Sequence, residues 1–419
     1  MIPTPTLRFW GFKEHPFADN ILRDELMPLF VDREDELSQV QDALGRSRVV
    51  GVHGNLGVGK SSFLHKLRKI LIEEGIPVAY VHLNADSEDT LYRELLTELL
   101  ILLEGGSLPV KRMAGFRTEE EAQRLHASVA SSRGADFGAK LAGIGGKFVE
   151  DRTVSVEAHT ESSARESIRR IFDALKGPLV VVFDDFEKLR YEASGKTRDY
   201  FPILSRFVST LEELLNRKQV SFVLSMDNQV EGLLEKEQKK GGQFAFSLNH
   251  LCRIPNLTLD HLWKLVAVRL KAHGWKAKTS GFMTDAAFYG LAIASANHPR
   301  KAVNILAEAM WVVANRKGAK ERVVDDEAVR DGAARARLPM DEKDWRAVEY
   351  LLEHGESAND DDALRQHLGY KRSKNKTGYH TSVDRKLNAV AASLRLEFQE
   401  ITSGNTTKKV LRLPKVTRK

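Results

Sequence analysis

The 419-residue chain is 42% hydrophobic and 29% charged, which predicts a globular protein of about two to four domains with buried cores. Its one cysteine, Cys252, excludes a disulfide within the chain and favours a reducing compartment. No basic and apolar leader opens the sequence and no apolar run is long enough to cross a bilayer, so we expect a cytoplasmic protein with no membrane partner.

The positive charge is concentrated at the C-terminal end. Residues 371–419 contain 13 lysines and arginines against three acidic residues, a local charge of about +10 within a formal total of +6. The rest of the chain therefore carries about −4. This segregation favours a C-terminal module that binds a polyanion such as nucleic acid.

The first part of the chain alternates between predicted strands and helices. The expected elements, in order, are a helix within 22–46, a strand within 47–54, a helix at 60–75, a strand at 77–85, a helix ending near 103, a strand within 177–189, a helix at 201–218 and a strand at 219–228. Residues 105–165, rich in Gly, Ala and Ser, form an insert without a predicted element. Continuous apolar strands alternating with helices predict an α/β fold, a parallel sheet with helices on both faces.

From about residue 256 the strands give way to helices. Four are predicted, at 258–274, 284–296, 299–318 and 325–336. A third part follows, with helices at 341–355, 360–369 and 376–395 and then a β-hairpin within 396–414 that turns at Ser-Gly-Asn. We therefore expect three domains: 1–255, 256–338 and 339–419.

Gly54-x4-Gly59-Lys60-Ser61 has the spacing of a phosphate-binding loop, and it lies between a predicted strand and a predicted helix. Its glycines let backbone N–H groups turn inward around a phosphate, Lys60 reaches the β- and γ-phosphates, and the Ser61 hydroxyl binds Mg²⁺. The pattern predicts ATP and Mg²⁺ as ligands. The residues expected to bind the nucleotide are Gly54, Asn55, Gly57, Val58, Gly59, Lys60, Ser61 and Ser62.

The apolar run LVVVFDD ends in Asp184 and Asp185, at the edge where open α/β sheets bind ligands. Asp184 is expected to hold Mg²⁺ through water. Asp185 either polarises the attacking water or only caps the strand end. Because phosphoryl transfer depends mainly on positioning and charge, a poorly placed base predicts a slow ATPase.

The order of these elements resembles that of the AAA+ ATPases and, within them, the initiator group of origin-recognition proteins and replication initiators, with similarity to transposition-regulator ATPases. The sequence FVDREDELSQV at 30–40 is similar to a box that contacts the adenine, with Asp32 where glycine is usual. The resemblance covers most of the chain. It implies a P-loop NTPase domain, a helical AAA+ lid, a C-terminal winged helix and self-association on ATP and DNA.

The resemblance also implies residues that respond to the γ-phosphate. The segment at 291–318 looks like the second sensor of the family, in which an arginine after a proline contacts the γ-phosphate; here this is Arg300. The first sensor would be Ser225 or Asp227, after the strand at 219–228. An arginine finger would be Arg253 or a lysine of EKEQKKGG at 235–242, although a solvated charge is the commoner role of such residues.

The part after the lid resembles the winged-helix domain of initiators, whose third helix enters the major groove. The resemblance implies contacts with double-stranded DNA from Lys371, Arg372, Lys374, Lys376, Arg385, Lys386, Lys408 and Lys409. A winged helix that binds protein is the alternative. The insert at 105–165 either touches DNA or is a surface loop.

Two functions fit these features. The first is an ATP-dependent DNA-binding switch or loader that serves replication initiation, transposition or a mobile-element or defence process. The alternative is a STAND-type signalling NTPase that acts through a protein partner, a class in which VVVFDDF is more typical. A third, more remote possibility is a secretion-associated ATPase. It is suggested by GFKEHPF at 11–17, which resembles an opening that such proteins share with transposition ATPases, and the absence of a predicted membrane segment argues against it.

Overall fold

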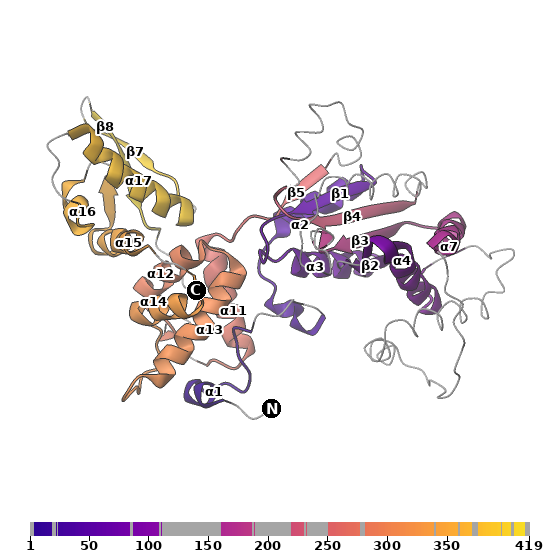
Figure 1. The fold of residues 1–419 in the computed structure, drawn as a ribbon, viewed down its shortest axis with the longest axis horizontal. Helices are drawn as coiled ribbons and strands as arrows, with labels where there is room; N and C mark the ends of the chain where they lie inside the picture. Colours follow the sequence, from indigo (N-terminus) through magenta and orange to yellow (C-terminus); the bar gives the residue numbers. More distant parts are fainter. Residues whose placement is uncertain are drawn as a thin grey trace. The chain divides into compact units, whose positions relative to one another are not determined.

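A computed structural model describes residues 4–18, 22, 24–83, 87–108, 110, 161–186, 188, 219–229, 232, 250–276, 281–338, 341–358, 361–370, 376–394, 396–403 and 406–414. They belong to two compact units (Figure 1). One, the helical unit, contains Met1–Asp32, Gly57–Gly59 and Pro255–Lys419. The other, the sheet unit, contains Arg33–Leu56 and Lys60–Ile254.

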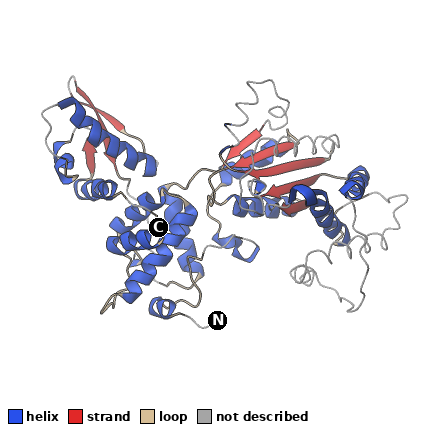
Figure 2. Ribbon diagram, in the orientation of Figure 1, coloured by secondary structure: helices blue, strands red, loops and turns tan. Residues whose placement is uncertain are grey.

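A parallel sheet forms the centre of the sheet unit (Figure 2). In the spatial order β2-β3-β4-β1-β5, its strands are β1 (Val49–His53), β2 (Val78–His82), β3 (Leu179–Asp184), β4 (Val220–Met226) and β5 (His250–Arg253). Every neighbouring pair is parallel. β1 and β3 are buried at every position, because both faces of the sheet are covered. The predicted α/β fold is confirmed.

Helices cover both faces of this sheet. α4 (Ser87–Glu104) and α7 (Glu161–Ala174) share a core with alternate strand residues, among them Val81 and Val181. α2 (Glu34–Leu44) contacts β1 and β5, and α3 (Lys60–Glu73) contacts β2 and β3. His65 of α3 stacks on Tyr80, the neighbour of Val81 on β2, at 4.5 Å between ring centroids. Since successive strand residues point to opposite faces, α3 lies on the face opposite to α4 and α7.

β5 is an element that the sequence does not predict. Its four residues, HLCR, show neither alternation nor a long apolar run. The strand forms because its backbone pairs with the edge of β1, from Val50 opposite His250 to His53 opposite Arg253. A partner strand, not a local pattern, makes this segment extended.

The helical unit begins with α1 (Pro5–Trp10) and the 3-10 helix η1 (Asp24–Leu29) and continues with α11 (Leu259–Ala272), α12 (Asp285–Ser295), α13 (Pro299–Asn315) and α14 (Asp326–Arg335). Thr258, Thr284 and Asp325 cap the N-termini of α11, α12 and α14 with side-chain oxygens. Gly332 allows α14 to approach α13, because a Cβ there would lie 2.8 Å from the backbone nitrogen of Ala309.

The N-terminal segment packs on these helices, whereas the sequence places it with the nucleotide-binding domain. The Trp10 indole Nε1 donates to the Met310 carbonyl at 2.9 Å, and its ring lies 5.2 Å from that of Phe282. The Arg269 guanidinium donates to the carbonyl oxygens of Pro16, at 3.3 Å, and Ala18, at 3.0 Å. Aromatic burial and these hydrogen bonds hold the described residues between 4 and 18 in the helical unit.

The C-terminal part contains α15 (Glu342–His354), β6 (Glu356–Ala358), α16 (Asp362–His367), α17 (Lys376–Leu394), β7 (Gln399–Ser403) and β8 (Thr406–Arg412). The strands form an antiparallel sheet in the order β6-β8-β7. The short strand β6, like β5, has no signal in the sequence and exists through its pairing with β8.

The C-terminal part and the preceding helices share one core, so residue 338 is not a boundary between compact units. The Trp345 ring of α15 covers Gly290 of α12, where a Cβ would lie 2.0 Å from Trp345 Cζ3. Asn297 Nδ2, in the turn between α12 and α13, donates to the Ser393 carbonyl of α17 at 3.0 Å. Both contacts join segments that are far apart in the sequence.

Some predicted segments lie outside the described residues, namely the helix at 201–218, most of the insert at 105–165 and the lysines of 235–242. Within the part of the chain that the structure describes, no helix is both long and apolar enough to span a membrane.

Candidate nucleotide and metal site

The phosphate loop connects β1 to α3, as its sequence predicts. Lys60, the first residue of α3, is 5% exposed, and its Nζ donates to the carbonyl of Gly54 at 3.1 Å. Gly57 has φ +82° and Gly59 has φ +104°, backbone conformations that only glycine adopts without strain. Ser61 and Ser62 follow in the first turn of α3, and both are partly exposed. A loop of this shape can surround an anion with backbone N–H groups.

Asp184 ends β3 and its side chain is fully buried. Oδ2 accepts a hydrogen bond from the Tyr80 hydroxyl at 2.8 Å, and Oδ1 accepts one from the Asp185 backbone N–H at 2.8 Å. Burial, and then the neighbouring Asp184 carboxylate, raises the pKa of Tyr80 far above its usual range, so Tyr80 remains a hydrogen-bond donor. Two donors therefore fix the orientation of this buried carboxylate.

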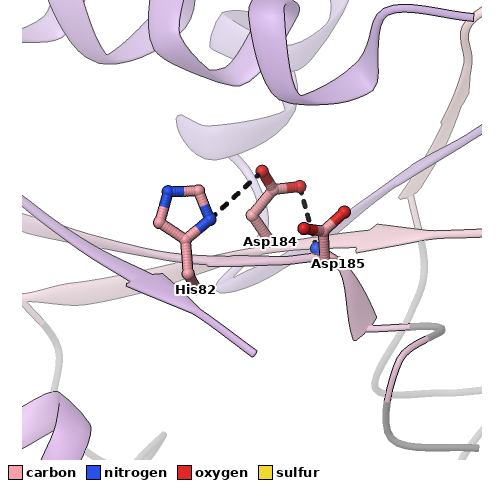
Figure 3. A group of neighbouring side chains, drawn as sticks. All are labelled: His82, Asp184 and Asp185. Carbon is pink, nitrogen blue, oxygen red and sulfur yellow. Dashed lines mark hydrogen bonds and ion pairs between the residues drawn. The ribbon is translucent and has the colours of Figure 1, made fainter. Parts of the chain in front are cut away.

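Asp185 begins the loop after β3 with φ +61°, an uncommon conformation for a residue other than glycine. Its Oδ2 pairs with the Lys188 Nζ at 2.6 Å. His82, the last residue of β2, places Nδ1 3.8 Å from Asp184 Oδ2. His82, Asp184 and Asp185 thus gather at one edge of the sheet, with one potential ligand atom from each within 4.8 Å of the others (Figure 3). Two carboxylates and an imidazole suit a divalent cation.

The two residues expected to form the first sensor occupy different environments. Ser225 is fully buried in β4, and its Oγ has no hydrogen-bond partner among the described residues. Asp227 follows β4, and its Oδ1 accepts a hydrogen bond from the Gln229 backbone N–H at 3.0 Å, as a turn residue does.

Asn228, which follows β4, contacts the phosphate loop and is not among the residues expected from the sequence. Its Nδ2 donates to Asn55 Oδ1 at 2.7 Å, and its Oδ1 lies 3.4 Å from His53 Nδ1. The sequence did hold a signal, since the family resemblance implies a polar residue, often asparagine, for the first sensor. The end of a predicted strand does not show which of the polar residues Asp227, Asn228 and Gln229 turns toward the phosphate loop.

Arg300 lies in the first turn of α13, in the helical unit, and is exposed. Pro299 starts that helix, and His298 caps it by accepting a hydrogen bond from the Lys301 backbone N–H at 3.4 Å. Proline and the cap fix where the helix begins, and with it the direction in which Arg300 leaves the backbone.

The residues expected to contact DNA differ in their surroundings. Lys371, Arg372 and Lys374 lie outside the described residues, and Lys376 is the first residue of α17. Arg385 on α17, and Lys408 and Lys409 on β8, are exposed.

Lys386 differs from the prediction. Its Nζ forms ion pairs with Asp341 and, at 2.9 Å, with Asp344, so it joins α17 to α15. Its hydrogen bond to Asp341 lowers the pKa of that carboxyl. Because two carboxylates already neutralise Lys386, we remove it from the DNA-contact set.

A parallel sheet with a phosphate loop after β1 and a buried aspartate at the end of β3 defines a P-loop NTPase. Residues 29–212 match the AAA ATPase domain family. This part of the chain is therefore similar to AAA ATPase domains, in agreement with the resemblance that the order of its elements indicates.

No curated protein matches the chain. Among solved structures, the chain is similar to the ORC2 protein of Aeropyrum pernix in ADPNP–ADP complexes, with 14% identity over 95% of this chain and 93% of that one and a TM-score of 0.45. It is similar to the A. pernix ORC1 protein in complex with DNA, with 14% identity over 94% and 92% and a TM-score of 0.43. It is also similar to a Walker-type ATPase of Pyrococcus abyssi, with 14% identity over 95% of this chain and 97% of that one and a TM-score of 0.41.

Proposed function

We propose that this protein is an ATP-dependent, DNA-binding switch or loader of the AAA+ type, which binds ATP with Mg²⁺ and hydrolyses it slowly to control its assembly on duplex DNA. The observation that carries the proposal is the position of three groups at the carboxyl ends of neighbouring strands or in the segments that follow them. Lys60 follows β1, Asp184 ends β3 and Asn228 follows β4. The order β3-β4-β1 places these strand ends side by side, so the three side chains can serve one phosphate chain.

Each group has a separate role in this proposal. The Lys60 ammonium neutralises charge on the β- and γ-phosphates, and Ser61 and Asp184 bind the Mg²⁺, which stabilises negative charge when bound. Asn228 donates from its amide to the γ-phosphate. Asp185 accepts a proton from the attacking water, but its ion pair with Lys188 makes it a weaker acceptor. That pairing supports slow hydrolysis.

We propose that the C-terminal part is a winged helix whose exposed cations contact DNA phosphates. Arg385 lies on α17, and Lys408 and Lys409 lie on the strand β8 that follows the hairpin turn. The strong positive charge of residues 371–419 supports a polyanionic partner. Contacts of this kind position a protein on duplex DNA and do not determine a sequence preference.

A contact within the helical unit supports the switch. Arg300 is proposed to contact the γ-phosphate, and Asn297, three residues earlier, donates to the Ser393 carbonyl at the end of α17. Asn297 is fully buried and has φ +56°, so its turn is held in one conformation. A movement of the turn that carries Arg300 would therefore be passed to the proposed recognition helix.

Duplex-DNA binding tests the proposal, measured with ATP, a slowly hydrolysed analogue or ADP across a salt series. We expect tighter binding with ATP and a steep fall of affinity with salt. Lys60→Ala should weaken nucleotide binding by about 10- to 100-fold, the value of a hydrogen bond to a charged group. Arg300→Ala should keep nucleotide binding and lose the effect of ATP on DNA. DNA binding that ignores both nucleotide and salt would refute the proposal.

A matched pair of variants tests the DNA-contact set. Replacing Lys408 and Lys409 together with glutamine should lower the slope of log affinity against log salt by about 2, since each phosphate contact contributes roughly one. Lys386→Gln removes one charge from the same part of the chain and should leave the slope unchanged. A protein that changes conformation with ATP but does not bind DNA would instead favour the signalling alternative.

A further inference from the structure

The edge of the sheet at which β2 and β3 end contains a possible nitrogen ligand, the imidazole of His82, beside the two aspartates. His82 ends β2 directly opposite Asp184, the last residue of β3, in the parallel register. Residues paired in this way point to the same face of a sheet. The imidazole of His82 and the carboxylate of Asp184 are therefore held together by the backbone of two adjacent strands, which are rigid elements.

The spacing of the three side chains fits the ligands of one ion. Metal–ligand distances of about 2.0–2.2 Å place two ligands of one ion about 3 Å apart when adjacent and about 4.2 Å apart when opposite. His82 Nδ1 and Asp184 Oδ2 are 3.8 Å apart, and the ligand atoms of His82, Asp184 and Asp185 all lie within 4.8 Å (Figure 3). Small side-chain rotations would bring all three onto one cation.

The charges around the cluster favour a cation. The Asp184 carboxylate is fully buried, and a buried anion is costly unless a positive charge or hydrogen bonds compensate it. Tyr80 and the Asp185 backbone N–H each donate one hydrogen bond, and a carboxylate has further lone pairs for a metal. Lys188 neutralises part of the charge of Asp185. The orientation imposed by Tyr80 is the kind of support that ligands of a metal usually have.

An imidazole changes which metal such a site prefers. Mg²⁺ takes oxygen ligands and retains several waters, whereas imidazole suits transition-metal ions such as Zn²⁺, Fe²⁺ and Ni²⁺. Mn²⁺ favours oxygen ligands among these ions but binds an imidazole nitrogen more readily than Mg²⁺ does, and it can be followed by magnetic resonance. A phosphate loop with only aspartates and a serine hydroxyl would supply oxygen alone.

We propose that His82, Asp184 and Asp185 form a mixed nitrogen and oxygen site that binds a divalent transition-metal ion such as Mn²⁺ directly, with His82 Nδ1 as the nitrogen ligand. This inference rests on the metal site of the proposed function and extends it to the nucleotide-free protein, in which Asp185 binds the metal instead of the attacking water. It implies that Mn²⁺ binds more tightly than Mg²⁺ and that nucleotide is not needed to hold it.

Electron paramagnetic resonance of Mn²⁺ with the full-length, nucleotide-free chain tests the site. We expect bound Mn²⁺ to show pulsed-EPR modulation from imidazole ¹⁴N, and protein labelled with ¹⁵N-histidine to show ¹⁵N modulation in its place. This labelling needs no variant, so it does not depend on how a substitution affects folding. Bound Mn²⁺ without nitrogen modulation would overturn the proposal.

Variants then assign the nitrogen to one residue. His82→Gln should abolish the modulation and weaken Mn²⁺ binding tenfold or more, since even residues that only support a ligand change affinity by about 10- to 100-fold. His250→Gln, a change in β5 of the same sheet, should alter neither. Modulation that persists in His82→Gln would show that another histidine binds the metal, and would refute the assignment.

Binding of ATP with Mg²⁺, followed with a fluorescent nucleotide, separates this inference from the proposed function. Nucleotide binding without nitrogen modulation would refute the mixed site and leave the ATPase proposal intact. Nitrogen modulation without nucleotide binding would refute the ATPase proposal and leave the metal site.

Discussion

Replacing Gly290 with alanine would place a methyl group against the ring of Trp345. The added Cβ would lie 2.0 Å from Cζ3, 2.6 Å from Cη2 and 3.0 Å from Cε3, whereas carbon atoms in contact are normally about 3.5–4.0 Å apart. The helix or the ring must therefore move by about 1.5 Å. The ring cannot rotate away easily, because it is 1% exposed, its Nε1 donates to Glu349 Oε1 at 2.6 Å, and the Arg330 guanidinium lies 4.8 Å from its centroid.

Two opposing terms set the size of the effect of Gly290→Ala. Overpacking a core typically costs about 1–3 kcal/mol, and a rigid ring places this case at the upper end. Alanine is favoured over glycine within a helix by about 1 kcal/mol. We therefore expect the free energy of unfolding to fall by about 1–2 kcal/mol.

Denaturant unfolding followed by tryptophan fluorescence measures this change. Gly281→Ala is the matched control, because nothing lies within 4 Å of its added Cβ and its φ is outside the left-handed region; it should unfold like the parent. The contact between Trp345 and Gly290 links α15 to α12, so Gly290→Ala should also reduce the effect of ATP on DNA binding. A Gly290→Ala protein as stable as the parent would refute the proposed packing of Trp345 on α12.

Three further changes test the sites described above. Tyr80→Phe removes a hydrogen bond to the buried Asp184 carboxylate and should lower the free energy of unfolding by about 1.5–3 kcal/mol, measured by denaturant unfolding; an unchanged protein would contradict the 2.8 Å contact. Asn228→Ala should still bind ATP but hydrolyse it more slowly than the parent. An unchanged hydrolysis rate in a phosphate-release assay would exclude Asn228 as a sensor. The Arg316 side chain, by hydrogen bonding, lowers the pKa of Asp325, so this carboxylate stabilises the fold above its unfolded pKa of about 4 and loses that contribution as the pH falls through the lower, folded pKa. Asp325→Asn should therefore show a smaller loss of stability than the parent on acidification below about pH 4, and an identical pH profile would contradict the pairing.

The phosphate loop and the parallel sheet could be predicted from the sequence because both depend on neighbouring residues. The glycines and Lys60 work through a turn of eight residues, and its strand and helix context is local as well. Asp184 was placed correctly at a strand end because the apolar run before it is continuous. Residues 29–212 match the AAA ATPase domain family, in agreement with that local pattern.

Contacts between distant segments decided the remaining features. β5 and β6 are too short to show a pattern and exist only through the strands beside them. Lys386 looked like one more cation of a basic tail, but the fold places two aspartates of α15 around it. The choice of Asn228 over its polar neighbours depends on how the chain turns after β4.

The placement of His82 beside Asp184 shows the same division most clearly. The sequence by itself determines that both residues lie in β-rich segments, the strands predicted at 77–85 and within 177–189. Nothing local relates two residues about a hundred positions apart. Only the pairing of β2 with β3, and its register, brings the imidazole to within 3.8 Å of the carboxylate, because hydrogen bonding between strand backbones fixes which side chains become neighbours.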